Sequence, residues 1–121
     1  MHSAAKAYGA VAQQTASPRN LEAQLLLRAA SRLQNVHDHW DGQRLALEQA
    51  LLFNRKLWTI FMTSVTNNDN PLPAEVRQNV ANIGIFVINH TLNVMGNPQP
   101  ERLRSLININ RQLAAGLSGT A

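Results

Sequence analysis

Cysteine is absent from the 121-residue chain, which excludes a disulfide framework, a catalytic thiolate and cysteine-ligated metal sites. The lack of cysteine fits a reducing compartment. The N-terminal run MHSAAK, residues 1–6, also lacks the uninterrupted apolar segment that a secretory signal requires. We therefore expect a cytoplasmic protein.

Long apolar runs are missing as well. The longest stretch without a charged side chain runs from Gln78 to Pro100, and among its polar residues are Asn79, Asn82, Asn89, His90 and Asn93. Each of these would be costly inside a bilayer. The stretch therefore predicts a helix buried in a soluble protein, with no membrane partner.

Catalytic groupings are the third absence. The seven carboxylates are scattered, no order of residues suggests a Ser-His-Asp triad, and there is no glycine-rich phosphate loop. The best candidate for a metal site is His37-x-His39 with Asp38 and Asp41, but a structural zinc needs four ligands and no second His or Cys pair exists to complete them. We interpret this stretch as a solvated turn, and we expect no enzyme, no metal and no cofactor.

Positive charge is in excess but is not concentrated. The net charge is +4 and the pI is near 10.7. The excess lies at the two ends of the chain, without a dense Lys/Arg run or a basic stripe with interleaved aromatics. A solvated basic surface is the simpler interpretation, and the pattern does not favour nucleic acid as a partner.

Helical spacing dominates the rest of the chain. Residues 1–16 are small and polar apart from Tyr8, and they predict a flexible arm before a single domain over 17–121. Ser17 and Pro18 are a typical helix start. Turn-forming residues then divide the domain into four helices, expected over 18–36, 43–66, 73–95 and 100–116. The predicted fold is all-α, a compact four-helix bundle-like domain.

Apolar residues repeat at steps of three and four in each helix, which predicts the buried faces. The first helix has Leu21, Leu25, Ala29, Leu33 and Val36; the second has Leu47, Leu51, Asn54, Trp58, Phe61 and Val65; the fourth has Leu103, Leu106, Ile107, Leu113, Ala114 and Leu117, with Gly116 and Gly119 suited to its end.

Asparagine interrupts the apolar face of two helices in the same phrase. Asn54-Arg55-Lys56-Leu57 is followed by Trp58, and a near copy returns at Asn110-Arg111-Gln112-Leu113. A buried amide must find hydrogen-bond partners, because leaving it unpaired costs about 1–3 kcal/mol. Asn54 and Asn110 could therefore bond to each other or to a neighbouring backbone and fix the register of their helices. Arg55 and Arg111 would lie at the edge of the face, where they can pair with a carboxylate or a chain terminus. The alternative is that these residues, with Trp58, line a groove that grips a partner main chain.

The third helix carries two apolar faces, one more than a small bundle needs. One face has Val76, Val80, Ile83, Val87 and Val94; the other has Ala81, Ile85, Ile88, Leu92 and Met95. We predict that the second face binds a partner, since methionine and leucine adapt to an incoming helix better than a row of valines. The alternative is that this face forms the contact of a homodimer.

The chain resembles the bacterial flagellar biosynthesis regulator FlaF family over roughly residues 8–117. The segments that carry the resemblance are Ser17-Pro18-Arg19, Asn54-Arg55-Lys56-Leu57-Trp58, Asn70-Pro71-Leu72-Pro73 and the closing stretch from Leu106 to Leu117. One departure is Asn20, where an acidic residue would complete a capping box after Ser17; its absence weakens the helix start by a fraction of a kcal/mol.

The resemblance implies a small cytoplasmic helical protein needed for flagellin production and export. It also implies a functional link to the FlbT-type repressor, which acts on flagellin messenger RNA. We therefore expect a non-enzymatic, chaperone-like regulator that covers an apolar helix of flagellin in a groove. The alternative is an RNA-binding post-transcriptional regulator that uses the basic ends of the chain.

Overall fold

The computed structural model describes residues 18–42 and 44–119, and within them the chain forms four α-helices, one short 3-10 helix and no strand. The elements are α2 (Pro18–Asp38), α3 (Arg44–Val65), α4 (Ala74–Gly96), η1 (Pro100–Leu103) and α5 (Arg104–Ser118). The all-α, four-helix prediction is confirmed, with helix ends within two residues of those expected for all but the start of the last helix. The predicted arm over residues 1–16 and the Ser17 cap lie outside the described residues.

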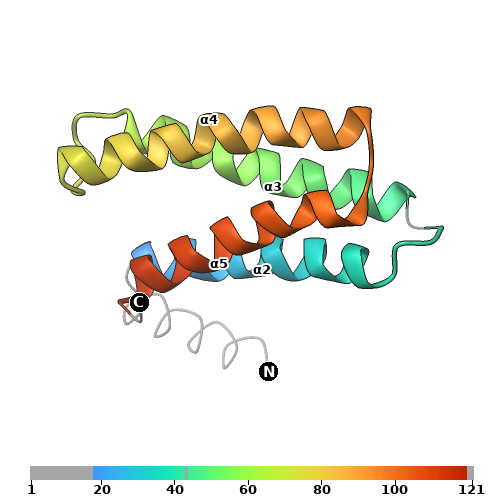
Figure 1. The fold of residues 1–121 in the computed structure, drawn as a ribbon. Coiled ribbons are helices and arrows are strands. Elements are labelled where there is room, and N and C mark those ends of the chain that lie inside the picture. Colours follow the sequence, from blue (N-terminus) through green and yellow to red (C-terminus); the bar gives the residue numbers. More distant parts are fainter. Residues whose placement is uncertain (1–17, 43, 120–121) are drawn as a thin grey trace, which may run out of the picture.

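The helices are arranged as two pairs. Figure 1 shows α2 beside α5 in one pair and α3 beside α4 in the other. α2 also packs against α3 and so joins the pairs, whereas α4 packs principally on α3. None of the described helices is long and apolar enough to cross a bilayer.

The asparagine-rich loop after α3 forms a hydrogen-bonded turn. Asn67 Oδ1 accepts a hydrogen bond from the Asp69 amide at 3.0 Å, and Asn70 Oδ1 accepts one from the Leu72 amide at 2.9 Å. Asn70 Nδ2 donates back to the Ser64 carbonyl at 3.2 Å, near the end of the helix. These local bonds compete with helical ones, which is why the chain reverses here and starts α4 after Pro73.

The core follows the predicted face of α3 throughout. All six members of that face, from Leu47 to Val65, are buried. In η1 and α5, Leu103, Leu106, Ile107 and Ala114 are buried as predicted, whereas Leu113 and Leu117 are half-buried. α5 continues through Gly116 and ends at Ser118. Gly119 caps it with a φ of 75°, the left-handed conformation that favours glycine.

The predicted buried face of α2 is wrong in its first half. Leu21 and Leu25 are exposed, and the chain buries Ala23, Leu26 and Ala30 in their place. Both sets have helical spacing, so periodicity alone does not separate them. The buried set contains alanines, which let the backbone of α2 approach α5 closely along their extensive contact. Val76, expected in the core, is also exposed, in the first turn of α4.

Candidate functional site

The asparagines of the repeated phrase meet in the core. Trp58 Nε1 donates a hydrogen bond to Asn110 Oδ1 at 2.9 Å, and Asn110 Nδ2 donates to Asn54 Oδ1 at 2.6 Å. The indole N–H can only donate, so it sets the direction of the whole relay. Asn54 Nδ2, at the far end, has no acceptor among the described residues. The relay ties α3 to α5 through side chains that lie 52 and 56 residues apart in the sequence.

This geometry decides between the two interpretations of the phrase. Asn54, Trp58 and Asn110 have no exposed surface at all. They therefore fix the register of α3 against α5, as the structural interpretation predicts. The groove interpretation of these three residues is corrected, because a partner cannot touch side chains that the chain's own helices cover completely.

The two arginines of the phrase point to different neighbours. Arg55 lines a cavity between α3 and α4, whereas Arg111 Nη2 donates to Gln34 Oε1 of α2 at 3.3 Å. Neither arginine forms an ion pair with a carboxylate of the described chain, as the sequence had suggested they could. Only Arg55 lies beside the α4 face that we predict to bind a partner.

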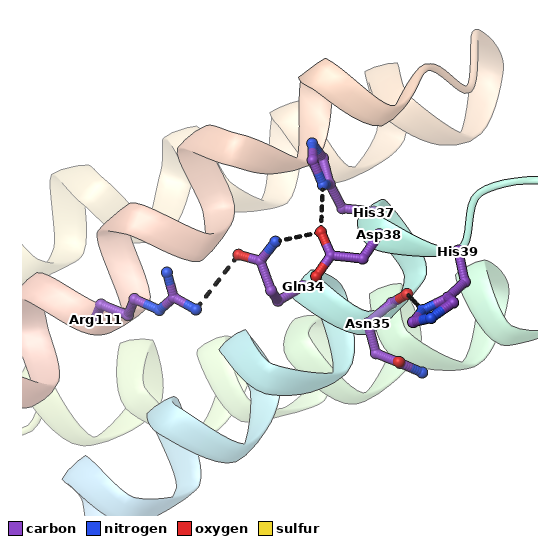
Figure 2. Close-up of polar contacts among 6 residues, drawn as sticks. All are labelled: Gln34, Asn35, His37, Asp38, His39 and Arg111. Atoms are coloured by element: carbon purple, nitrogen blue, oxygen red, sulfur yellow. Dashed lines mark hydrogen bonds and ion pairs between the residues drawn. The ribbon is translucent and has the colours of Figure 1, made fainter.

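A network of polar side chains lies at the C-terminal end of α2 (Figure 2). Arg111 contacts Gln34, Gln34 Nε2 donates to Asp38 Oδ1 at 2.8 Å, and His37 Nδ1 lies 2.9 Å from the same oxygen. The hydrogen bonds from His37 and then Gln34 lower the pKa of Asp38 below its ordinary value. The network is polar and exposed, and it joins α5 to α2 at the surface.

The two histidines of His37-x-His39 are engaged separately. The ring of His39 donates to the Asn35 carbonyl at 3.1 Å, while that of His37 bonds to Asp38 (Figure 2). Among the described residues, no group of three or more His, Asp or Glu side chains could hold a metal ion. The local bonding is that of a helix end.

The second apolar face of α4 is open to solvent. Ile85 is 53% exposed and Leu92 is 55% exposed; Met95 is exposed too, whereas Ile88 and Ala81 are half-buried. The other face supplies the buried valines Val80, Val87 and Val94, which lie against the core. The prediction of which face stays exposed is therefore correct, and its role in binding remains a prediction.

A cavity of about 190 Å³ adjoins this face. It lies between α3 and α4 and is lined by Glu48, Leu51, Leu52, Arg55, Thr91 and Met95. Met95 belongs both to the cavity and to the exposed row of α4, so the two surfaces are continuous. Glu48, Leu52 and Thr91 were missed from the sequence. Leu52 had a detectable signal, since it is a large apolar residue one position off the buried face.

Comparison with known proteins assigns the chain to a family. The family model described as "Flagellar protein FlaF" matches residues 4–117, which is nearly the whole chain. Neither the curated proteins nor the solved structures compared with this chain gave a match.

Proposed function

This chain belongs to the FlaF family of flagellar proteins, and from that membership we propose that it is a cytoplasmic regulator of flagellin synthesis and export that binds flagellin as a chaperone does. The proposed ligand is an apolar helical segment of flagellin. The proposed binding needs neither a cofactor nor a catalytic step. The proposal also includes a functional link between this protein and the FlbT-type repressor.

The observation that carries the proposal is the open face of α4 beside a cavity. Ile85, Leu92 and Met95 expose apolar surface along one side of a helix whose other side is already packed. Side chains at this spacing form a stripe that can pack against a partner helix laid alongside. The apolar terminal helices of an unassembled flagellin, which would otherwise self-associate, would supply a matching apolar stripe.

The test replaces Leu92 with glutamate. Leu92 is a better position than half-buried Ile88, because its substitution changes the surface without entering the core. We expect Leu92→Glu to reduce co-purification of flagellin about tenfold or more, with circular dichroism and melting temperature close to wild type. Flagellin capture that survives this change would rule out the α4 face as the binding surface.

Ile60 offers a matched control. It is 65% exposed on α3, yet it belongs neither to the cavity lining nor to the row on α4. Ile60→Glu makes the same chemical change at a similar exposure, and flagellin capture should be unaffected. Equal losses for the two variants would show that any exposed glutamate is harmful.

Salt dependence separates the RNA-binding alternative. Binding of flagellin messenger RNA through arginines would weaken steeply as salt rises, whereas burial of an apolar helix changes little. We expect flagellin capture to weaken only modestly between low and physiological salt, because few charges would contribute to it, whereas RNA binding through many phosphates would fall steeply. Tight, salt-sensitive binding to flagellin message, with no capture of flagellin, would establish the RNA function instead.

A further inference from the structure

We propose that α3 and α4 border one continuous groove, here called the hairpin groove, whose ligand is an amphipathic helix with acidic residues flanking its apolar stripe. The inference rests on the proposed function, since it assigns the chemistry of the partner to the same face of α4.

Two parallel rows of side chains define the hairpin groove. The row on α4 consists of Arg77, Ala81, Ile85, Ile88, Leu92 and Met95. The row on α3 consists of Glu48, Leu52, Arg55, Thr59, Met62 and Thr66. In each row the steps are of three or four residues, which keeps every member on one side of its helix.

Two cavities, and one close contact between them, show that the two rows lie against each other. At one end, the cavity of about 190 Å³ is lined by Leu52, Arg55 and Met95. At the other end, a cavity of about 320 Å³ is lined by Thr66, Arg77 and Ala81.

Between the cavities, the side chain of Met62 on α3 packs against Gly84 of α4. A Cβ atom on Gly84 would lie only 2.6 Å from Met62 Cγ. Members of both rows thus border the two cavities, and Met62 of the α3 row packs on α4 between them. Arg77 to Met95 spans about 27 Å at the rise of an α-helix, enough for a partner helix of about 18 residues.

The threonines along the groove do not make it polar. Thr59 Oγ1 donates to the Arg55 carbonyl at 2.9 Å, and Thr66 Oγ1 donates to the Met62 carbonyl at 2.8 Å. On the floor, Thr91 Oγ1 donates to the Val87 carbonyl at 2.7 Å. Each hydroxyl is satisfied by a backbone carbonyl of the preceding turn, so the exposed side chains of Thr59 and Thr66 present their methyl groups to a ligand.

The two ends of the groove carry positive charge. Glu48 is the only carboxylate in either row, and it is already paired with Arg44 Nε at 3.1 Å. Arg55 forms no ion pair with the described residues. Arg77 donates from Nη1 to the Asn67 carbonyl at 3.3 Å, while its buried Nε has no acceptor among those residues.

The charges of Arg55 and Arg77 determine which kind of ligand the hairpin groove favours. Carboxylates beside the apolar stripe of a partner helix would meet Arg55 at one end and Arg77 at the other, which favours both encounter and register. A second copy of this chain would instead bring two sets of arginines together, with no unpaired carboxylate in the rows to offset them. We therefore assign the groove to an acidic amphipathic helix and not to self-association.

Two synthetic peptides test the assignment directly. Both have 18 residues and the same leucine stripe; one carries glutamates and the other lysines on the flanks of the stripe. With the full-length protein, fluorescence anisotropy should show about tenfold tighter binding of the glutamate peptide. Arg55→Glu should abolish or reverse this preference.

Lys56→Glu is the matched control, since it changes the same charge on the next residue of α3 but outside the row. It should leave the preference intact, and circular dichroism should show all variants folded. Equal binding of the two peptides, binding of neither, or equal effects of the two variants would overturn the proposal. So would a dimer, seen by sedimentation, that the glutamate peptide does not dissociate.

The proposed function can fail separately. If flagellin capture needs Leu92 but ignores Arg55→Glu, the charge inference is overturned and flagellin binding stands. If the glutamate peptide binds selectively while Leu92→Glu leaves flagellin capture intact, the groove stands and flagellin is not its ligand.

Discussion

At the scale of single residues, the relay of Trp58, Asn110 and Asn54 is the feature with the largest expected effect. Asn110 is the middle member, accepting from the indole and donating to Asn54. Removing its amide leaves two buried groups unpaired, whereas removing either end leaves one. The position in the relay, and not the residue type, should therefore set the cost.

We expect Asn110→Ala to lower the free energy of unfolding by about 2–5 kcal/mol, and Asn54→Ala by about 1–3 kcal/mol. Trp58→Phe removes the N–H with little change of shape and should resemble Asn54→Ala. Urea denaturation of the three variants measures the order. Equal losses at Asn54 and Asn110 would contradict the relay, and so would additivity in the double variant.

Glu22 is a residue at which pH should matter. Its partial burial raises the pKa of the carboxyl above the ordinary value of 4.5, with Arg19 acting in the opposite direction. The folded pKa is the higher one, so the carboxyl contributes stability below the unfolded pKa and loses it as pH rises through the folded pKa.

Glu22→Gln should therefore raise the melting temperature at neutral pH, and the gain should vanish in acid below the ordinary pKa of glutamate. Thermal melts of both proteins across that range provide the measurement. The pKa of Asp38 is lowered, so its effect on stability depends on pH in the opposite direction: the stability that it contributes is lost as pH falls through its folded pKa. A melting-temperature gain that persists in acid would show that the charge of Glu22 is not the cause.

At the scale of elements, the crossing of α3 and α4 depends on Gly84. A Cβ atom there would lie 2.6 Å and 2.7 Å from Cγ and Sδ of Met62, and 3.4 Å from Cε3 of Trp58. Met62 can move, but the indole is held by its hydrogen bond to Asn110. A large side chain at 84 must therefore push the two helices apart.

Gly84→Val should destabilise the protein by about 1–3 kcal/mol through this overpacking. Gly116 is the control, because it lies inside α5 and a Cβ atom there would meet no atom within 4 Å apart from its chain neighbours and the backbone of its own helix. Gly116→Ala should stabilise by about 0.5–1 kcal/mol, because alanine is the better helix former. Chemical denaturation compares them, and a neutral Gly84→Val would show that the crossing is loose.

At the scale of the whole molecule, α4 is the least supported helix. It packs principally on α3, and its hydrogen bond to η1 runs from His90 Nε2 to the Arg102 carbonyl at 2.7 Å. The carbonyl only accepts, so Nε2 must carry the proton. His90 also stacks on Phe86, with ring centroids 5.2 Å apart.

Hydrogen exchange should accordingly be faster in α4 than in α2 and α5, which cover each other extensively. His90→Ala should speed exchange in α4 without a comparable change in α2. Mass spectrometry of exchanged peptides resolves the helices. Uniform protection across all four would mean that α4 opens only when the whole domain unfolds.

The sequence by itself determined the helices, the buried face of α3 and the need of Asn54 and Asn110 for partners. These depend on local periodicity and on the chemistry of single side chains, which a backbone expresses wherever it is placed. The tertiary structure alone decided that Leu26 and not Leu25 enters the core, and that Trp58 completes the asparagine pair. It also turned Arg55 toward α4 and Arg111 toward α2. Such choices depend on how each helix is rotated against its neighbours, and that rotation is set jointly by contacts between residues far apart in the chain.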